Sequence, residues 1–169
     1  VFAGFLMVEK FEFTVAEISM LLIANAAINV VFAPKIGRLI QRFGERKSLI
    51  FEYIGLSLIF AGYAFVESSE FAVFLYIADH LFFSIAIALK TYFQKIADPA
   101  DIASSSGVSF TINHIAAVFI PVVFGLVWLY SPSMVFLAGS AMAIVSLILA
   151  LNMPSKPALG NEVLIGKFS

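Results

Sequence analysis

The chain has 169 residues, of which 62% are hydrophobic and 12% charged, with a formal net charge of −1. Soluble domains average about 45–50% apolar and about 25% charged residues, so this composition excludes an ordinary water-soluble domain and predicts a membrane protein. The lack of cysteine excludes disulfides and thiolate metal sites, and the charge balance offers no basic face for nucleic acid.

The apolar stretches predict an all-α polytopic membrane protein, because about 20 apolar residues are needed to cross the hydrocarbon core. Residues 1–8 are apolar but too short to span, and we interpret them as the end of a truncated first helix. Five full spans are expected, at residues 18–39, 48–66, 71–94, 102–130 and 132–152. Residues 153–169 are expected to form a polar, loosely ordered tail.

The connection between the first two full spans is unusually basic. Half of all Lys and Arg residues fall between Pro34 and Leu49, namely Lys35, Arg38, Arg42, Arg46 and Lys47. We interpret this stretch as a short cytoplasmic loop, because cytoplasmic loops carry an excess of Lys and Arg. The other connections then alternate sides, only Lys10 among the basic residues lies outside, and the C-terminus is cytoplasmic.

Two connections that contain proline predict helix starts. Asp98 precedes Pro99, and Ser131 precedes Pro132. Asp and Ser are good N-caps, and proline is favoured at the first helical position. We therefore expect Asp98 and Ser131 to cap the helices that follow them.

Polar side chains inside the predicted spans are the main functional clue, because such groups usually face a bundle interior or a wet cavity. The spans at 48–66 and 132–152 carry few of them, so we expect these two helices to face lipid or to act as struts. Seven residues on the other spans are candidates for a substrate or ion pathway: Asn25, Asn29, Asp79, His80, Lys90, Asn113 and His114.

Simpler explanations compete with a functional one for most of these residues. Asp79 and His114 are proposed as a proton-sensitive pair on neighbouring helices. Asp79 and Lys90 are eleven residues apart and so share one face of an uninterrupted helix, about 16 Å apart along its axis. Alternatively, Lys90 snorkels to the interface, His114 bonds to helix backbone, and Asn25 and Asn29 join helices.

The basic stretch, the topology and the polar pattern together resemble the C-terminal six-helix half of a major facilitator superfamily (MFS) transporter, a twelve-helix bundle. The family's loop motif reads G-x-x-x-D-R-x-G-R-R/K and is followed by Leu. Gln41 stands at the Asp position and Glu45 at the first Arg position after the second glycine. The cytoplasmic loop motif is therefore assigned to Gly37, Arg38, Gln41, Arg42, Gly44, Arg46 and Lys47, followed by Leu49.

The resemblance implies transmembrane transport of a small solute by alternating access, with a missing N-terminal half supplying the other wall of the site. Coupling to protons, a lipid bilayer environment and a bacterial inner-membrane location are expected, without a cofactor. A non-transporting helix-bundle module or receptor-like subunit is the alternative. An enzyme is not expected, because Asp79 is the only acid deep in a span and the catalytic, phosphate-loop and zinc patterns are lacking.

Overall fold

The structure is a computed structural model that describes residues 1–165, and these residues form helices with short connections. The helices are α1 (Phe2–Phe11), α2 (Val15–Phe43), α3 (Glu45–Ala64), α4 (Ser69–Phe83), the 3-10 turn η1 (Ser84–Ala86), α5 (Ile87–Ile96), α6 (Ile102–Trp128) and α7 (Pro132–Leu151). Five segments are long and apolar enough to cross a membrane, with α4, η1 and α5 counted as one. The predicted all-α polytopic membrane fold is confirmed.

Local sequence signals explain several helix starts. Thr14 and Glu17 form a reciprocal capping box at the start of α2, with each side chain bonding to the backbone of the other. The Ser68 hydroxyl accepts the Phe71 N–H at the start of α4. Ser131 precedes α7 and Pro132 is its first residue, as expected from the sequence, although the Ser131 side chain makes no capping bond.

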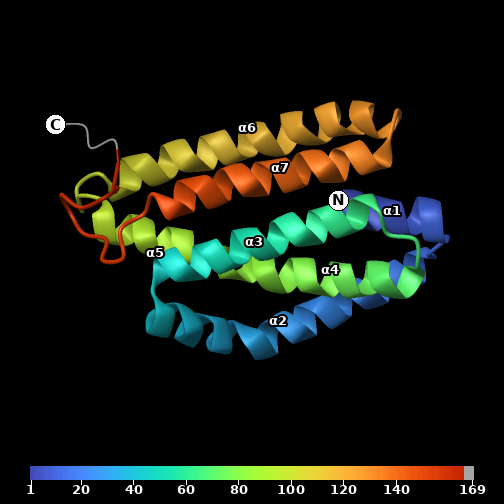
Figure 1. Ribbon diagram of the computed structural model, residues 1–169, viewed down its shortest axis with the longest axis horizontal. Coiled ribbons are helices and arrows are strands. Elements are labelled where there is room, and N and C mark those ends of the chain that lie inside the picture. Colours follow the sequence, from blue (N-terminus) through green and yellow to red (C-terminus); the bar gives the residue numbers. More distant parts are fainter. Residues whose placement is uncertain (166–169) are drawn as a thin grey trace.

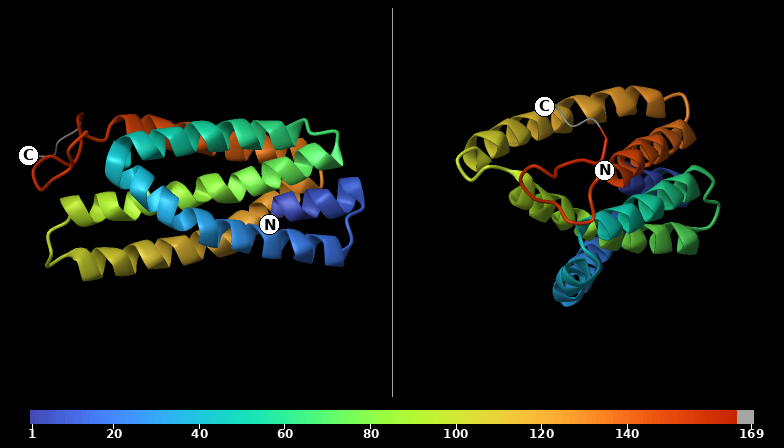
Figure 2. Two further views of the ribbon diagram at one scale, coloured as in Figure 1. Left: turned by 90° about the horizontal axis from the view of Figure 1, so that it is seen from below. Right: turned by 60° about the vertical axis from the view of Figure 1, so that its left-hand side comes forward.

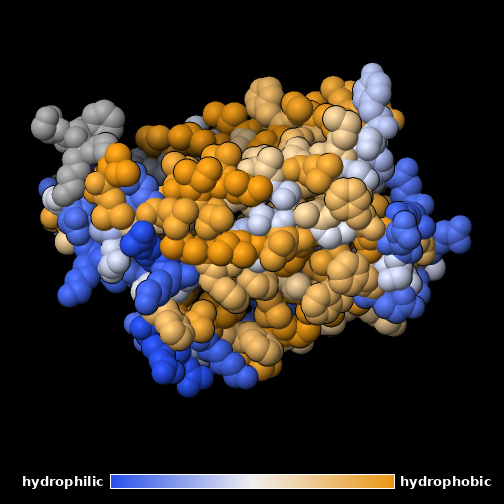
Figure 3. All heavy atoms as spheres, viewed as in Figure 1, coloured by the Kyte–Doolittle hydropathy of each residue, from blue (hydrophilic) through white to orange (hydrophobic). Residues whose placement is uncertain are grey.

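The helices lie nearly side by side and their connections gather at two ends (Figure 1). Across the view the order is α6, α7, α3, α4 and α2, with α1 behind α3 and α7. One end, here called the basic end, holds the α2–α3 turn, the α5–α6 connection and the chain after α7. Hydrophilic residues cover both ends and hydrophobic residues cover the band between them (Figure 3), as a membrane-spanning unit requires.

The basic stretch is helical, which corrects the prediction of a loop over Pro34 to Leu49. Helix α2 continues to Phe43 and α3 begins at Glu45, so Gly44 alone joins them. Gly44 has φ 84° and ψ 161°, a backbone conformation that glycine adopts without steric cost. Helix α2 is about 44 Å long, which exceeds the hydrocarbon thickness and carries its basic last turns into the polar interface.

The predicted span at 71–94 is interrupted, because the 3-10 turn Ser84–Ala86 separates α4 from α5. The Ser84 hydroxyl lies 2.8 Å from the His80 carbonyl, one turn back along α4. A serine that bonds back in this way competes with the backbone hydrogen bonds and bends a helix. The turn also changes the helical register between Asp79 and Lys90.

The start of α6 differs from its prediction. The helix begins at Ile102 with Asp101 at the N-cap position, and Asp98 lies outside it. The Asp98 carboxylate accepts the Ala100 N–H at 2.9 Å, which closes a local turn around Pro99. The Asp-Pro pair therefore forms a turn before the helix and does not cap it.

Helices α3 and α7 pack closely along their whole length. The Ser133 hydroxyl donates to the Ala64 carbonyl at 2.7 Å, and the Ser140 hydroxyl donates to the Ser57 carbonyl at 2.8 Å. Small residues let helix backbones approach in this way inside a membrane. Around this pair the larger apolar cluster includes Tyr63 and Phe136, whose rings stack at 5.0 Å.

The chain after α7 packs onto the basic end over the part that the structure describes. Met153 is buried, Asn152 bonds to the backbone of Ile165, and the Tyr92 hydroxyl donates to the Glu162 carbonyl. Residues 152–165 therefore make more contacts than the expected loosely ordered tail. The rest of the predicted tail, residues 166–169, lies outside the described residues.

Candidate functional site

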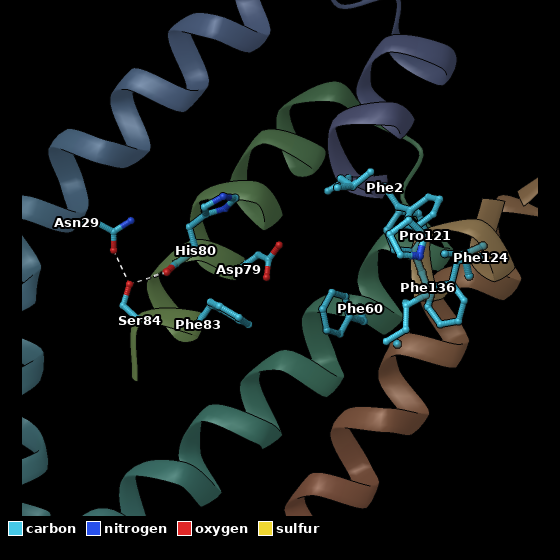
Figure 4. Close-up of a pocket in the computed structure, with 15 residues that line it drawn as sticks. Phe2, Asn29, Phe60, Asp79, His80, Phe83, Ser84, Pro121, Phe124 and Phe136 are labelled. Carbon is cyan, nitrogen blue, oxygen red and sulfur yellow. Dashed lines mark hydrogen bonds between the residues drawn. The ribbon is translucent and has the colours of Figure 1, made fainter. Parts of the chain in front are cut away.

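A half-open cavity of about 540 Å³ lies within the apolar band and is lined by parts of α1, α2, α3, α4, η1, α6 and α7. Figure 4 shows that its wall has two chemical characters. Polar side chains from α2, α4 and η1 occupy one side together with Phe83, and the other labelled aromatic rings occupy the opposite side, with Asp79 between them. This cavity is the candidate site.

The polar side is built on the break between α4 and α5. The Ser84 hydroxyl lies 2.5 Å from Asn29 Oδ1 and 2.8 Å from the His80 carbonyl, so its single hydrogen is shared between these acceptors. Asn29 Nδ2 donates to the Asn25 carbonyl at 3.1 Å. The amide of Asn29 is therefore held at both ends, and α2 is tied to α4 at this level.

His80 is oriented by its own helix. Its Nδ1 lies 2.9 Å from the Tyr76 carbonyl, and its ring lies 4.6 Å from the Tyr76 ring. A carbonyl only accepts, so Nδ1 carries the hydrogen and Nε2 remains an acceptor when the ring is neutral. His80 lines the cavity and offers that nitrogen to an occupant.

Asp79 lines the same cavity without a partner of its own. Within residues 1–165 its carboxylate makes no hydrogen bond and no ion pair, and the salt bridge found there joins Lys95 to Glu45. A carboxylate at membrane depth is costly unless a cation, a hydrogen-bond donor or a proton compensates its charge. Among the polar side chains of the site, the Asp79 carboxylate is thus the one that lacks both a hydrogen bond and an ion pair within residues 1–165.

Part of the aromatic side comes from two helices that the sequence did not assign to a site, α3 and α7. Phe60 of α3 and Phe136 of α7 line the cavity together with Phe124 of α6. Phe2 of α1 packs against Phe124 and Trp128, with ring centroids 6.0 and 5.6 Å apart. The expectation that 48–66 and 132–152 serve only as struts or lipid-facing helices is therefore too narrow.

Four of the seven predicted pathway residues lie outside this cavity. Lys90 is exposed beyond the 3-10 turn and does not share the cavity with Asp79. Asn113 and His114 are exposed on α6, and His114 Nδ1 bonds to the Phe110 carbonyl at 2.9 Å. Asn25 is buried next to Asn29, with both atoms of its side-chain amide unpaired within residues 1–165.

The motif residues form a second polar cluster at the basic end. Gly37, Arg38, Gln41 and Arg42 lie on the last turns of α2, whereas Arg46 and Lys47 lie on the first turn of α3. Arg46 donates to the Leu151 carbonyl at 2.9 Å and to the Ser155 hydroxyl at 3.3 Å, so it caps the C-terminal end of α7.

Glu45, which departs from the family motif, forms an ion pair that the sequence did not predict. It is buried, with 6% of its surface exposed, and its carboxylate accepts from Lys95 Nζ at 2.6 Å. The ion pair joins the start of α3 to the end of α5. Sequence reasoning missed Glu45, Ser84 and the aromatic wall, although the position of Ser84 four residues after His80 is a local signal for the helix break.

The arrangement defines a polytopic integral membrane protein with a mostly apolar, aromatic-rich cavity among its helices that has one polar side. The model of the Major Facilitator Superfamily matches residues 1–165, and the chain belongs to this family. A protein named as an uncharacterized MFS-type transporter, from Methanocaldococcus jannaschii, is 27% identical over 125 residues. The match covers 71% of this chain but only 30% of that protein, and no solved structure matches the chain.

Proposed function

We propose that this chain forms one wall of a secondary transporter that moves a small solute across the membrane by alternating access, without enzymatic chemistry. Membership of the superfamily and the transporter name of the relative support this proposal. The observation that carries it is the cavity, where Asp79, His80 and Asn29 line a half-open space within the apolar band. Ionisable residues inside a membrane usually mark a substrate or ion pathway.

Coupling to protons is part of the proposal. Asp79 lies in the cavity without a partner, and His114 is on a helix whose surface is exposed throughout its apolar window. We expect an N-terminal six-helix unit to cover exposed faces of α2 and α6, which would place His114 and Asn113 in the central pathway. In this arrangement, exposed apolar residues that the N-terminal unit does not cover are in contact with lipid. The membrane is a bacterial inner membrane, and the basic end lies in the cytoplasm.

The test uses the complete gene product that contains this chain, reconstituted into proteoliposomes. With an imposed pH gradient, a screen of small solutes should find saturable uptake that depends on the gradient. Replacing Asp79 with Asn or His114 with Ala should remove the pH dependence of that uptake. Uptake with wild-type kinetics and unchanged pH dependence in both variants would refute the proposed coupling.

Alternating access has its own measurement, which needs no known substrate. Cysteine at Ser84 is close in size to the native side chain, and this chain has no other cysteine. A membrane-impermeant thiol reagent should reach that cysteine from either side of the membrane. Leu58, exposed on α3 and absent from the cavity wall, is the control position for a lipid-facing cysteine. Reaction from one side only would favour the non-transporting module.

A further inference from the structure

We propose that the cavity binds an organic cation with an apolar, preferably aromatic body, whose positive charge lies against Asp79. This inference rests on the proposed transport function, for which it names the substrate class. Three properties of the cavity support it: the ionisable groups of its wall, its aromatic content and its size.

The ionisable groups of the wall are Asp79, the ring of His80 and the α-amino group of Val1. Asp79 is its only carboxylate, and none of the Lys or Arg side chains within residues 1–165 lines it. Lys10 bonds to the Val66 carbonyl, Lys95 pairs with Glu45, and Lys90 is exposed outside the cavity, so these basic side chains do not serve Asp79. Asp79 has no direct ionic partner within residues 1–165, and the His80 ring and the Val1 α-amino group act on it without contact. A positively charged occupant therefore supplies the direct partner that Asp79 lacks, whereas an anion would meet repulsion from its carboxylate.

The rest of the wall selects an organic cation over a metal ion. Ca²⁺ and related ions require about six oxygen ligands, whereas the cavity offers one free carboxylate. Asn29 Oδ1 already accepts one hydrogen bond from Ser84, and no group of three or more His, Cys, Asp or Glu residues that could hold a metal occurs in the part of the chain that the structure describes. Oxygen coordination of an inorganic cation is therefore incomplete at this site.

Aromatic rings complete the recognition of such a cation. Phe60 and Phe83 lie nearest to Asp79 in Figure 4, and Phe136, Phe2 and Phe124 lie on the far side. Ring faces attract organic cations and also bury their apolar groups. The volume of about 540 Å³ is within the range of cavities that enclose drug-sized ligands.

His80 refines the expected ligand. Its Nδ1 is fixed to the Tyr76 carbonyl, so the neutral ring keeps Nε2 as an acceptor, and His80 lines the same cavity as Asp79. A substrate with an N–H donor beside its cationic centre matches both groups. A quaternary cation has no N–H to donate to His80, so it can interact only with Asp79 and the rings. Its binding therefore measures the attraction between the cation and Asp79 without a contribution from His80.

The experiment measures equilibrium binding of radiolabelled tetraphenylphosphonium to the purified complete gene product. Triphenylphosphine oxide, which has similar rings without the net charge, is the neutral comparison. Asp79→Asn should weaken binding of the cation by about tenfold or more, while Asp79→Glu retains most of it. The neutral compound should bind weakly to the wild type and equally to all three proteins.

The aromatic contribution is tested on a residue whose removal spares the fold. Phe83 lines the cavity and is 66% exposed, so Phe83→Ala should weaken cation binding about two- to fivefold. Phe74 is the matched control, because it is 61% exposed on the same helix but does not line the cavity. Phe74→Ala should bind tetraphenylphosphonium as the wild type does.

Two results would overturn the inference. One is equal binding of the cation by the wild type and Asp79→Asn, and the other is equal affinity of the wild type for the cation and the neutral compound. Failure of the transport proposal looks different: binding that depends on Asp79 without any uptake would leave the cation site standing. Uptake of a neutral or anionic solute that ignores Asp79 would leave transport standing and remove the cation site.

Discussion

At the level of single residues, the close packing of α3 against α4 depends on a glycine, which has no side chain at the point of contact. A Cβ built on Gly55 of α3 would lie 2.0 Å from Cε1 of Phe82, far inside van der Waals contact. The Phe82 ring cannot simply retreat, because the Phe51 ring packs against it with centroids 5.1 Å apart. Gly55 therefore sets how closely α4 approaches α3.

Gly55→Ala should consequently destabilise the protein by about 1–3 kcal/mol through overpacking, despite the better helix propensity of alanine. The measurement is thermal unfolding in detergent, where the melting temperature should fall. Gly107→Ala is the matched control, because a Cβ at Gly107 meets nothing within 4 Å. An equal or higher melting temperature for Gly55→Ala than for Gly107→Ala would contradict the packing argument.

At the level of helices, ionic and hydrogen-bonded contacts at the basic end join elements that are distant in sequence. Glu45 connects α3 to α5 through Lys95, and Arg46 connects α3 to the end of α7 through the Leu151 carbonyl. Glu45 is buried whereas half of the Lys95 side chain is exposed, so water screens one partner only. Removing Lys95 would leave a buried carboxylate without its cation.

A charge exchange tests this link between α3 and α5. Lys95→Glu alone should lower the free energy of unfolding by about 1–2 kcal/mol, a figure reduced for the exposure of Lys95. Glu45→Lys alone should be at least as harmful because its site is buried. The double variant, with the charges exchanged, should recover much of the lost stability in the same detergent melting experiment. Additive losses in the double variant would show that the two residues do not interact.

The helices themselves were largely predictable, because twenty-residue apolar stretches have few alternatives to membrane spans. Their ends and interruptions were less so. Proline at 132 correctly marked a helix start, but Asp98 and Pro99 form a turn before α6. The helical course of the basic stretch was missed because charge was equated with a loop, whereas charged residues extend α2 into the interface up to Gly44.

At the level of the whole molecule, the polar residues of the candidate site could be predicted from the sequence, but its aromatic wall could not. Polar residues in apolar stretches pointed to Asn29, Asp79 and His80, which the fold does bring to one cavity. The aromatic wall had no such signal, since phenylalanine is abundant throughout the chain and only the packing of α1, α3, α6 and α7 selects the rings that face inward. Such selection depends on contacts between distant segments.

The two-ended distribution of charge leads to the last prediction, which concerns orientation in the membrane. The α3–α4 and α6–α7 connections share one end of the molecule, and the α5–α6 connection lies at the basic end (Figure 2). Cysteines at Ser68 and Ser131, introduced one at a time, should react with an impermeant maleimide added outside intact cells. A cysteine at Ala100 should react only after the membrane is opened, because basic segments remain in the cytoplasm.

The chain suits this measurement, since it contributes no cysteine that would react in the background. Asp98, Pro99 and Ala100 form an exposed turn, so the absence of labelling at Ala100 in intact cells reports membrane side and not burial. Labelling of Ala100→Cys from outside, with Ser68→Cys and Ser131→Cys protected, would reverse the orientation. Labelling of all three positions from outside would contradict the arrangement in which α6 crosses the bilayer, because Ala100 and Ser131 lie at its opposite ends.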